Sequence, residues 1–269
     1  MKKESFPARS QMIDAKSEQF LKLLVNLGGY CTVAHAEALK LGDTGRQARG
    51  NLRRLEFFGF LRRVAAYPVV YQVTKSAARH FGQDCGARRS HPLPTVQSRL
   101  SAVDFYLEAR RWPARFVFDH EQKIRTFNQA ECSANALPQR GGKPYLREEF
   151  ILWPPGRRLG VAIVDQTHIS AISQILGLAR RFAPTVREMG EGSLEFIIAS
   201  GSQNRYYVYR RLLQHPRLLQ EWPSEFELAI RPYCILRATP PVAALLCREC
   251  HRQKLQDRSP QEQRTTTLR

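Results

Sequence analysis

The first eighty residues show apolar positions at helical spacing, followed by two short apolar runs at strand spacing. Phe20, Leu23, Leu24 and Leu27 predict a helix that begins near Lys16, and the glycine pair at 28–29 ends it. We expect further helices over 32–41, 44–58 and 75–81, and strands over 61–64 and 69–73. This order of three helices, a strand, a turn, a strand and a helix is typical of a winged helix-turn-helix. The pattern therefore predicts a winged-helix domain over residues 16–82.

A change in composition separates this region from the rest of the chain. Residues 83–98 combine glycine, proline and basic side chains, which is typical of a linker. Beyond them, strands alternate with helices, and the predicted strands cover 115–118, 150–153, 159–164 and 194–199. Such alternation favours a mixed sheet with helices on its faces. We therefore expect an α/β domain over 99–245, an α+β or α/β fold class, and a disordered tail over 250–269.

Charge extends these predictions from fold to function. The chain carries 42 Lys and Arg against 24 Asp and Glu, a formal net charge of +18. Residues 1–80 alone contain 14 basic and 6 acidic residues. Such an excess attracts polyanions through counterion release and long-range steering. We therefore expect double-stranded DNA as the partner, with RNA as an open alternative. Other DNA-processing or transfer proteins and a second copy of the chain are further candidate partners.

The sequence shows no feature of a membrane or exported protein. No apolar run is long enough to span a bilayer, and the residues after Met1 lack the apolar core of a signal peptide. Six unevenly spaced cysteines do not form a disulfide framework, which is typical of a reducing compartment. The sequence therefore predicts a cytoplasmic protein without a membrane partner.

The third predicted helix is the element that enters the DNA major groove in a winged helix. Arginine chelates guanine, and asparagine or glutamine chelates adenine. The strands that follow carry side chains suited to the DNA backbone or the minor groove. The predicted DNA contacts are Thr44, Arg46, Gln47, Arg49, Asn51 and Arg53 on the helix, and Arg62, Arg63 and Tyr67 on the wing. The alternatives are a solvated basic helix face and a winged helix that contacts protein.

The second region contains the segment LGVAIVDQTHIS at residues 159–170. A basic winged helix, a linker and an α/β domain with this central strand resemble the plasmid replication-relaxation and mobilisation-type relaxase group. The resemblance implies a restriction-endonuclease-like fold for the second domain, and a role in plasmid or conjugative transfer. It also implies a divalent metal, Mg²⁺ or Mn²⁺, held by acidic residues that activate water against phosphate.

The same resemblance implies which acids would hold that metal. They would be Glu148 or Glu149 before a hairpin and Asp165 at the end of the next strand, with Thr167 nearby. Ile163 stands where the family's pattern has a glutamate, and the lysine expected of a nuclease is missing nearby. The resemblance therefore implies a degenerate nuclease domain, so we expect DNA binding without catalysis and without a cofactor. A metal-dependent nicking relaxase centred on Glu149 and Asp165, and a transcriptional regulator, are the alternatives.

Two further clusters carry less specific signals. Cys247, Cys250 and His251 have the spacing of half a zinc site or of a haem attachment, but we interpret them as a helix end near a polar tail. The segment 205–211 joins three tyrosines to three arginines. Such a basic and aromatic helix either packs against the fold or contacts DNA.

Overall fold

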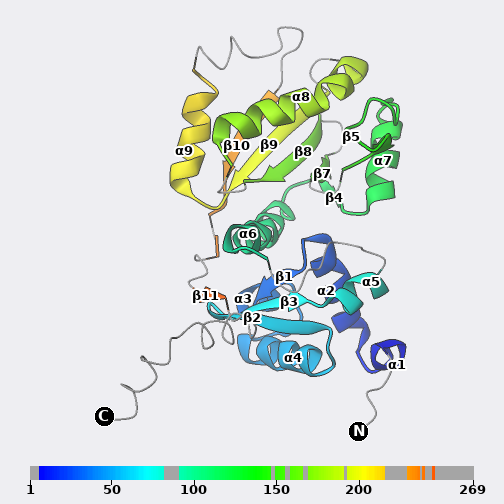
Figure 1. Cartoon of the computed structure of the whole chain (residues 1–269), viewed down its shortest axis with the longest axis vertical. Helices are drawn as coiled ribbons and strands as arrows, with labels where there is room; N and C mark the ends of the chain where they lie inside the picture. The colour runs from blue at the N-terminus through cyan, green and yellow to red at the C-terminus, as the bar shows by residue number, and fades with distance from the viewer. Residues whose placement is uncertain are drawn as a thin grey trace, which may run out of the picture. The chain divides into compact units, whose positions relative to one another are not determined.

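The structure is a computed structural model, and it consists of two compact units. It describes residues 6–81, 91–146, 149–154, 158–165, 169–190, 193–215, 229–236, 238–239 and 244–245. Unit 1 comprises Met1–Gln97 and Pro240–Arg269, and unit 2 comprises Ser98–Thr239. Both units mix helices with sheets (Figure 1). The molecule therefore has a mixed α and β fold, as the sequence predicts.

Unit 1 combines short helices with a small sheet. Its helices are α1 (Phe6–Ser10), α2 (Ala15–Asn26), α3 (Val33–Ala38), α4 (Gly45–Phe57) and α5 (Lys75–His80), together with the start of α6 (Leu93–Ala109). Four of these helices begin at a side chain that accepts a backbone N–H; the caps are Asp14 for α2, Thr32 for α3, Thr44 for α4 and Thr74 for α5. Such caps satisfy donors that the first helical turn leaves without a partner.

The sheet of unit 1 has four antiparallel strands. Its strands are β1 (Tyr30–Thr32), β2 (Leu61–Tyr67), β3 (Val70–Val73) and β11 (Ala244–Leu245), in the order β1-β3-β2-β11. Figure 1 shows α4 beside β2. Strand β11 pairs Ala244 with Tyr67, so a segment from far along the chain completes the sheet. The sequence pattern placed residues 244–245 in the second domain, because nothing local to them indicates this pairing.

Unit 2 is built around a five-stranded mixed sheet. Its strands are β4 (Arg115–Val117), β7 (Phe150–Trp153), β8 (Leu159–Val164), β9 (Leu194–Ser200) and β10 (Ala229–Cys234), in the order β10-β9-β8-β7-β4. Strands β8, β9 and β10 are parallel, and β4 and β7 are antiparallel to their neighbours. Parallel neighbours need crossover helices, which α8 (Ala171–Met189) and α9 (Gln203–Leu212) supply. A hairpin of β5 (Gln139–Arg140) and β6 (Lys143–Pro144) lies apart from this sheet.

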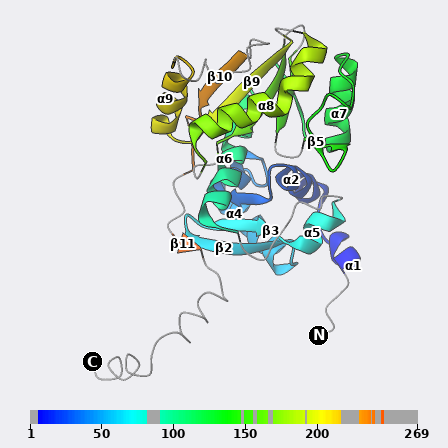
Figure 2. The same ribbon diagram turned by 45° about the horizontal axis from the view of Figure 1, so that its top comes forward.

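Helices cover both faces of the large sheet. On one face, Phe182 of α8 and Phe127 of α7 (His120–Gln129) share a core with Val161 and Phe196. Figure 1 and Figure 2 show α8 lying across the strands on this face. On the other face, Phe105 of α6 contacts the rings of Phe116, Phe150 and Tyr233. The two cores hold β8 in place, and the end of this strand therefore has a defined position.

The sequence pattern predicted most of these elements but not all. The helix predicted over 44–58 is α4. The glycine that follows it, Gly59, has a φ of +77°. Helix α7 and the hairpin of β5 and β6 were missed. The middle of the expected linker and the expected tail over 250–269 lie outside the described residues. In the described part of the chain, no helix has the length and hydropathy that crossing a membrane requires.

Candidate nucleic-acid interface

The cap and the apolar stripe of α4 fix which side of this helix faces inward. Thr44 Oγ1 accepts the backbone N–H of Gln47 at 3.3 Å and so starts the helix. Ala48, Leu52 and Leu55 follow at helical spacing, and each is at most 1% exposed. Because these three side chains lie on one face, the opposite face of α4 points to solvent.

The opposite face of α4 is a stripe of arginines around a glycine. Arg46, Gly50, Arg53 and Phe57 follow one another along this face, with Arg49 beside them, and all five residues are exposed. Among the described residues, no acidic side chain forms an ion pair with any of these three arginines. The arrangement leaves three guanidinium groups available to a partner that carries negative charge.

Three of the predicted DNA contacts already make hydrogen bonds within the fold. Thr44 caps α4, and Gln47 Oε1 accepts the backbone N–H of Asp43 at 2.9 Å. Asn51 is half-buried, and its Nδ2 donates to the carbonyl oxygen of Leu41 at 2.6 Å. The bond from Asn51 joins α4 to the turn before it, so this side chain has a structural task. Asparagine and threonine commonly make such local bonds to the backbone.

The three predicted wing residues differ from one another. Arg62 is half-buried, and its Nε and Nη2 donate to Oε1 of Gln72 at 3.0 and 2.6 Å. Arg63 is exposed, and its backbone N–H donates to Glu56 Oε1 at 3.3 Å. The backbone of Tyr67 pairs with Ala244, whereas its side chain lies outside the described residues. Of the two described wing arginines, Arg63 is the more accessible to a partner.

In unit 2, Asp165 is buried in an ion pair. It lies directly after β8 and is 4% exposed. Arg205 of α9 donates through Nε to Oδ2 at 2.7 Å and through Nη2 to Oδ1 at 2.8 Å. The hydroxyl of Tyr209 lies 2.9 Å from Oδ1 and 2.9 Å from Oε1 of Gln174. Both carboxylate oxygens are therefore already occupied by donors from the chain itself.

The same contacts shift the proton affinities of the partners of Asp165. Hydrogen bonding to Asp165 raises the pKa of the Arg205 guanidinium, so this group keeps its charge. Burial, followed by the nearby Asp165 carboxylate, raises the pKa of the Tyr209 hydroxyl. Tyr209 therefore stays a neutral hydrogen-bond donor, whereas a tyrosine nucleophile would need to lose its proton.

Glu149 is the second predicted acid, and it is also paired. It precedes β7, is 1% exposed, and forms an ion pair with Arg181 of α8. The buried Lys123 of α7 donates to the backbone oxygens of Glu149 and Leu146 at 2.6 and 2.9 Å. Burial lowers the pKa of Lys123 to about 8. Because Phe150 pairs with Ala162, Glu149 lies at the same end of the sheet as Asp165, yet each acid faces its own arginine.

The described residues do not assemble a metal centre. Among them, no group of three or more His, Cys, Asp or Glu side chains could hold a metal ion. Glu148 and Thr167 lie outside the described residues, as do Cys247, Cys250 and His251. The arrangement of Glu149 and Asp165 is that of two structural ion pairs.

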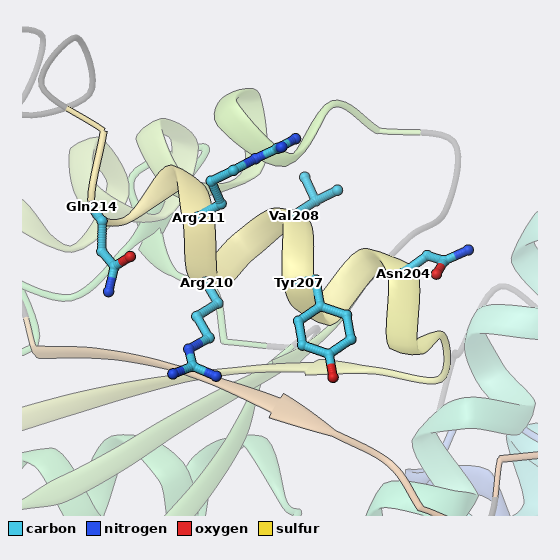
Figure 3. A pocket seen from close by; sticks show the side chains of 6 residues that line it. All are labelled: Asn204, Tyr207, Val208, Arg210, Arg211 and Gln214. Atoms are coloured by element: carbon cyan, nitrogen blue, oxygen red, sulfur yellow. The ribbon is translucent and has the colours of Figure 1, made fainter.

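Two hollows on unit 2 carry polar side chains. Figure 3 shows one, of about 520 Å³, along the outer side of α9; it is lined by Asn204, Tyr207, Val208, Arg210, Arg211 and Gln214. None of these six residues is acidic. The second hollow, of about 640 Å³, is lined by Trp112, Pro113, Ala114, Leu152, Pro154, Arg158, Gly160, Glu195, Ile197 and Arg231. In it, Arg231 pairs with Glu195 at 3.0 Å and lies over the ring of Trp112.

Comparison with known proteins gives no family for this chain. No protein-family model, no curated protein and no solved structure matches it. Its function is therefore inferred from the geometry of the described residues.

Proposed function

We propose that this chain binds double-stranded DNA through α4, with unit 1 acting as a winged helix. The exposed arginine face of α4 is the observation that carries this proposal. Helix α4 follows α2 and α3 and precedes the β2–β3 hairpin, which is the position of the recognition helix in that motif. A face with three arginines and no acidic partner among the described residues matches the charge of a phosphate backbone.

A second basic surface supports the same partner. The hollow along α9 presents Arg210 and Arg211 together with the exposed ring of Tyr207 (Figure 3). Arginine and aromatic side chains bind nucleic acid through phosphate contacts and stacking, without reading its sequence. On this proposal, unit 1 reads a site and α9 of unit 2 adds affinity that depends little on sequence.

We propose further that DNA is bound without being cut. The pairing of Asp165 with Arg205 supports this, since both oxygens of this carboxylate already accept hydrogen bonds from the chain itself. The resemblance to the relaxase group suggests a mobile element as the setting, with a degenerate nuclease-like fold in unit 2. The same proposal includes that the chain forms a homodimer and acts in the cytoplasm.

Affinity capture of sheared DNA tests the proposal. DNA from the source cell and its mobile elements is captured on the full chain at near-physiological salt and sequenced. One enriched site at a transfer or replication origin is the expected result. Uniform recovery would show that the net charge acts alone and would contradict recognition by α4. The enriched duplex, incubated with Mg²⁺ or Mn²⁺, should stay intact.

A ligand-responsive transcriptional regulator is the second candidate function. The hollow around Trp112 favours it, because an aromatic ring beside a charged pair suits a small polar molecule. The same capture experiment separates the two functions. A palindrome close to a promoter, instead of an origin, would favour the regulator.

A further inference from the structure

Gly50 occupies the middle of the exposed face of α4. It lies roughly opposite the buried Ala48, Leu52 and Leu55, and a Cβ added to it would meet no described atom within 4 Å other than its chain neighbours and the backbone of its own helix. The position therefore has room for any small side chain. Gly50 lies within α4 and has no positive φ, so its backbone conformation does not require glycine.

Two glycines on either side of α4, Gly42 and Gly59, have reasons within the fold. A Cβ on Gly42 would lie 2.4 Å from the backbone nitrogen of Ala48, so the turn before α4 has no room for one. Gly59 has a φ of +77°, which residues with a side chain rarely adopt. Neither reason applies to Gly50. A glycine inside a helix destabilises it relative to alanine, so the fold alone gives no account of this residue.

The neighbours of Gly50 provide a functional reason for a glycine at this position. Arg46, Arg49 and Arg53 lie one turn or less away on the same exposed face, and no described acid pairs with them. A helix with its side chains is about 10–12 Å across, and the major groove is about 12 Å wide. A helix that fits so closely can go deeper only where a side chain is missing. Long arginine side chains beside the gap can then reach base edges and phosphates on either side.

We propose that Gly50 is the point of closest approach between α4 and the major groove of duplex DNA. This inference rests on the proposed function and deepens it. The bare backbone at Gly50 sets how deeply α4 sits in the groove, and thereby places the guanidinium groups of Arg46, Arg49 and Arg53. Gly50 is thus a positioning residue that carries no charge itself.

The variant Gly50→Ala tests this in the full chain. It should raise the melting temperature, because alanine stabilises an exposed helix interior. It should also weaken binding to the duplex that the capture experiment enriches by about tenfold or more, as expected for a methyl group forced into a close-packed contact. The salt dependence of binding should keep its slope, because no phosphate contact has lost its charge.

Gly177 provides a matched control. It lies inside α8, is exposed, and would also place an added Cβ in open space. Gly177→Ala should raise the melting temperature in the same way and leave the affinity for DNA unchanged. Of the two arginines one turn away, Arg180 is exposed and Arg181 is paired with Glu149, so this surface carries fewer available arginines than the face around Gly50.

Each other outcome has a defined meaning. If Gly50→Ala binds as tightly as the unchanged chain while Arg49→Ala and Arg53→Ala bind weakly, this inference fails and the proposed function stands. If the unchanged chain does not bind duplex DNA, the proposed function fails first. A lower melting temperature for Gly50→Ala would show that the fold itself requires the glycine, which also overturns the inference.

Discussion

Arg205 holds the carboxylate of Asp165 with two parallel hydrogen bonds, 2.7 Å from Nε to Oδ2 and 2.8 Å from Nη2 to Oδ1. The two residues are forty positions apart, and the pair joins the end of β8 to α9. Asp165 is buried and Arg205 is mostly covered. A bidentate ion pair of this kind fixes the helix relative to the strand and compensates for removing both charges from water.

The first prediction concerns the loss of this pair. Asp165→Ala leaves a guanidinium with no compensating carboxylate in a mostly buried site, so the free energy of unfolding of unit 2 should fall by about 3 kcal/mol. Chemical denaturation followed by circular dichroism measures this. If Asp165 were instead a metal ligand, Asp165→Ala should raise the free energy of unfolding of the metal-free protein. Removing one of two clustered acids relieves their repulsion and often stabilises an enzyme without its metal.

The double variant Asp165→Leu with Arg205→Met is the control. It removes both charges and keeps apolar volume, so it should be more stable than Asp165→Ala. Equal losses in the two variants would show that Asp165 and Arg205 do not act as a pair.

The sequence predicted the carboxylate Asp165 but not its partner. Asp165 follows the apolar run of β8, and the resemblance to the relaxase group implied it as a metal ligand. Nothing local shows that Arg205 will return to it, since the contact depends on how β9 and α9 fold back over the sheet. The same holds for β11, whose pairing with β2 joins residues almost 180 positions apart.

Unit 1 was more predictable because its signals are local. Thr44 and the spacing of Ala48, Leu52 and Leu55 lie within a dozen residues, and they suffice to place α4 and its exposed arginines. Asn51 was assigned to DNA from its residue type and from its expected place on the polar face of the helix. Its bond to Leu41 depends on the turn geometry, which the sequence pattern does not contain.

The second prediction concerns pH and Lys123. Burial lowers the pKa of its ammonium to about 8, whereas in the unfolded chain the group titrates near 10.5. Between these values the unfolded chain binds more protons, so Lys123 contributes stability that grows as pH rises from about 8. Relative to Lys123→Met, the unchanged chain should gain up to about 1.4 kcal/mol of unfolding free energy per pH unit in this window.

Comparison with the Lys123→Met variant is needed because buried thiols act in the opposite direction. Burial raises the pKa of Cys132 to about 11, so its contribution falls as pH rises and is the same in both proteins. Denaturant titrations at pH 8 and pH 9.5 give the difference. If the difference in unfolding free energy between the two proteins did not change with pH, the burial of a charged Lys123 would be contradicted.

The third prediction separates two roles for Asn51. If its bond to Leu41 is its task, Asn51→Ala should lower the unfolding free energy by about 1 kcal/mol. Arg46→Ala, an exposed change on the same helix, should stay within about 0.5 kcal/mol of the unchanged chain. Binding measured well below the melting temperature should show an unaltered sequence preference for Asn51→Ala. A lost preference at one base pair with full stability would instead assign Asn51 to direct readout of adenine.

The last prediction concerns the arginines of α4. Arg49→Ala and Arg53→Ala should each weaken binding to the enriched duplex, because each removes an exposed guanidinium that has no acidic partner among the described residues. Where the lost contact is to a phosphate, the slope of log affinity against log salt should flatten by about 0.9. Where it is to guanine, specificity at that base pair should relax by about 1–3 kcal/mol. Fluorescence anisotropy across a salt series measures both effects.

Arg79→Ala is the control for charge alone. Arg79 is exposed on α5 in the same unit, so its removal changes the net charge by the same amount without altering the face of α4. Its effect on affinity should be small and should not depend on the DNA sequence, since distant exposed charges are screened at physiological salt. Equal effects of Arg79→Ala, Arg49→Ala and Arg53→Ala would mean that DNA responds to overall charge. Unchanged affinity in the two α4 variants would mean that another face of unit 1 contacts DNA.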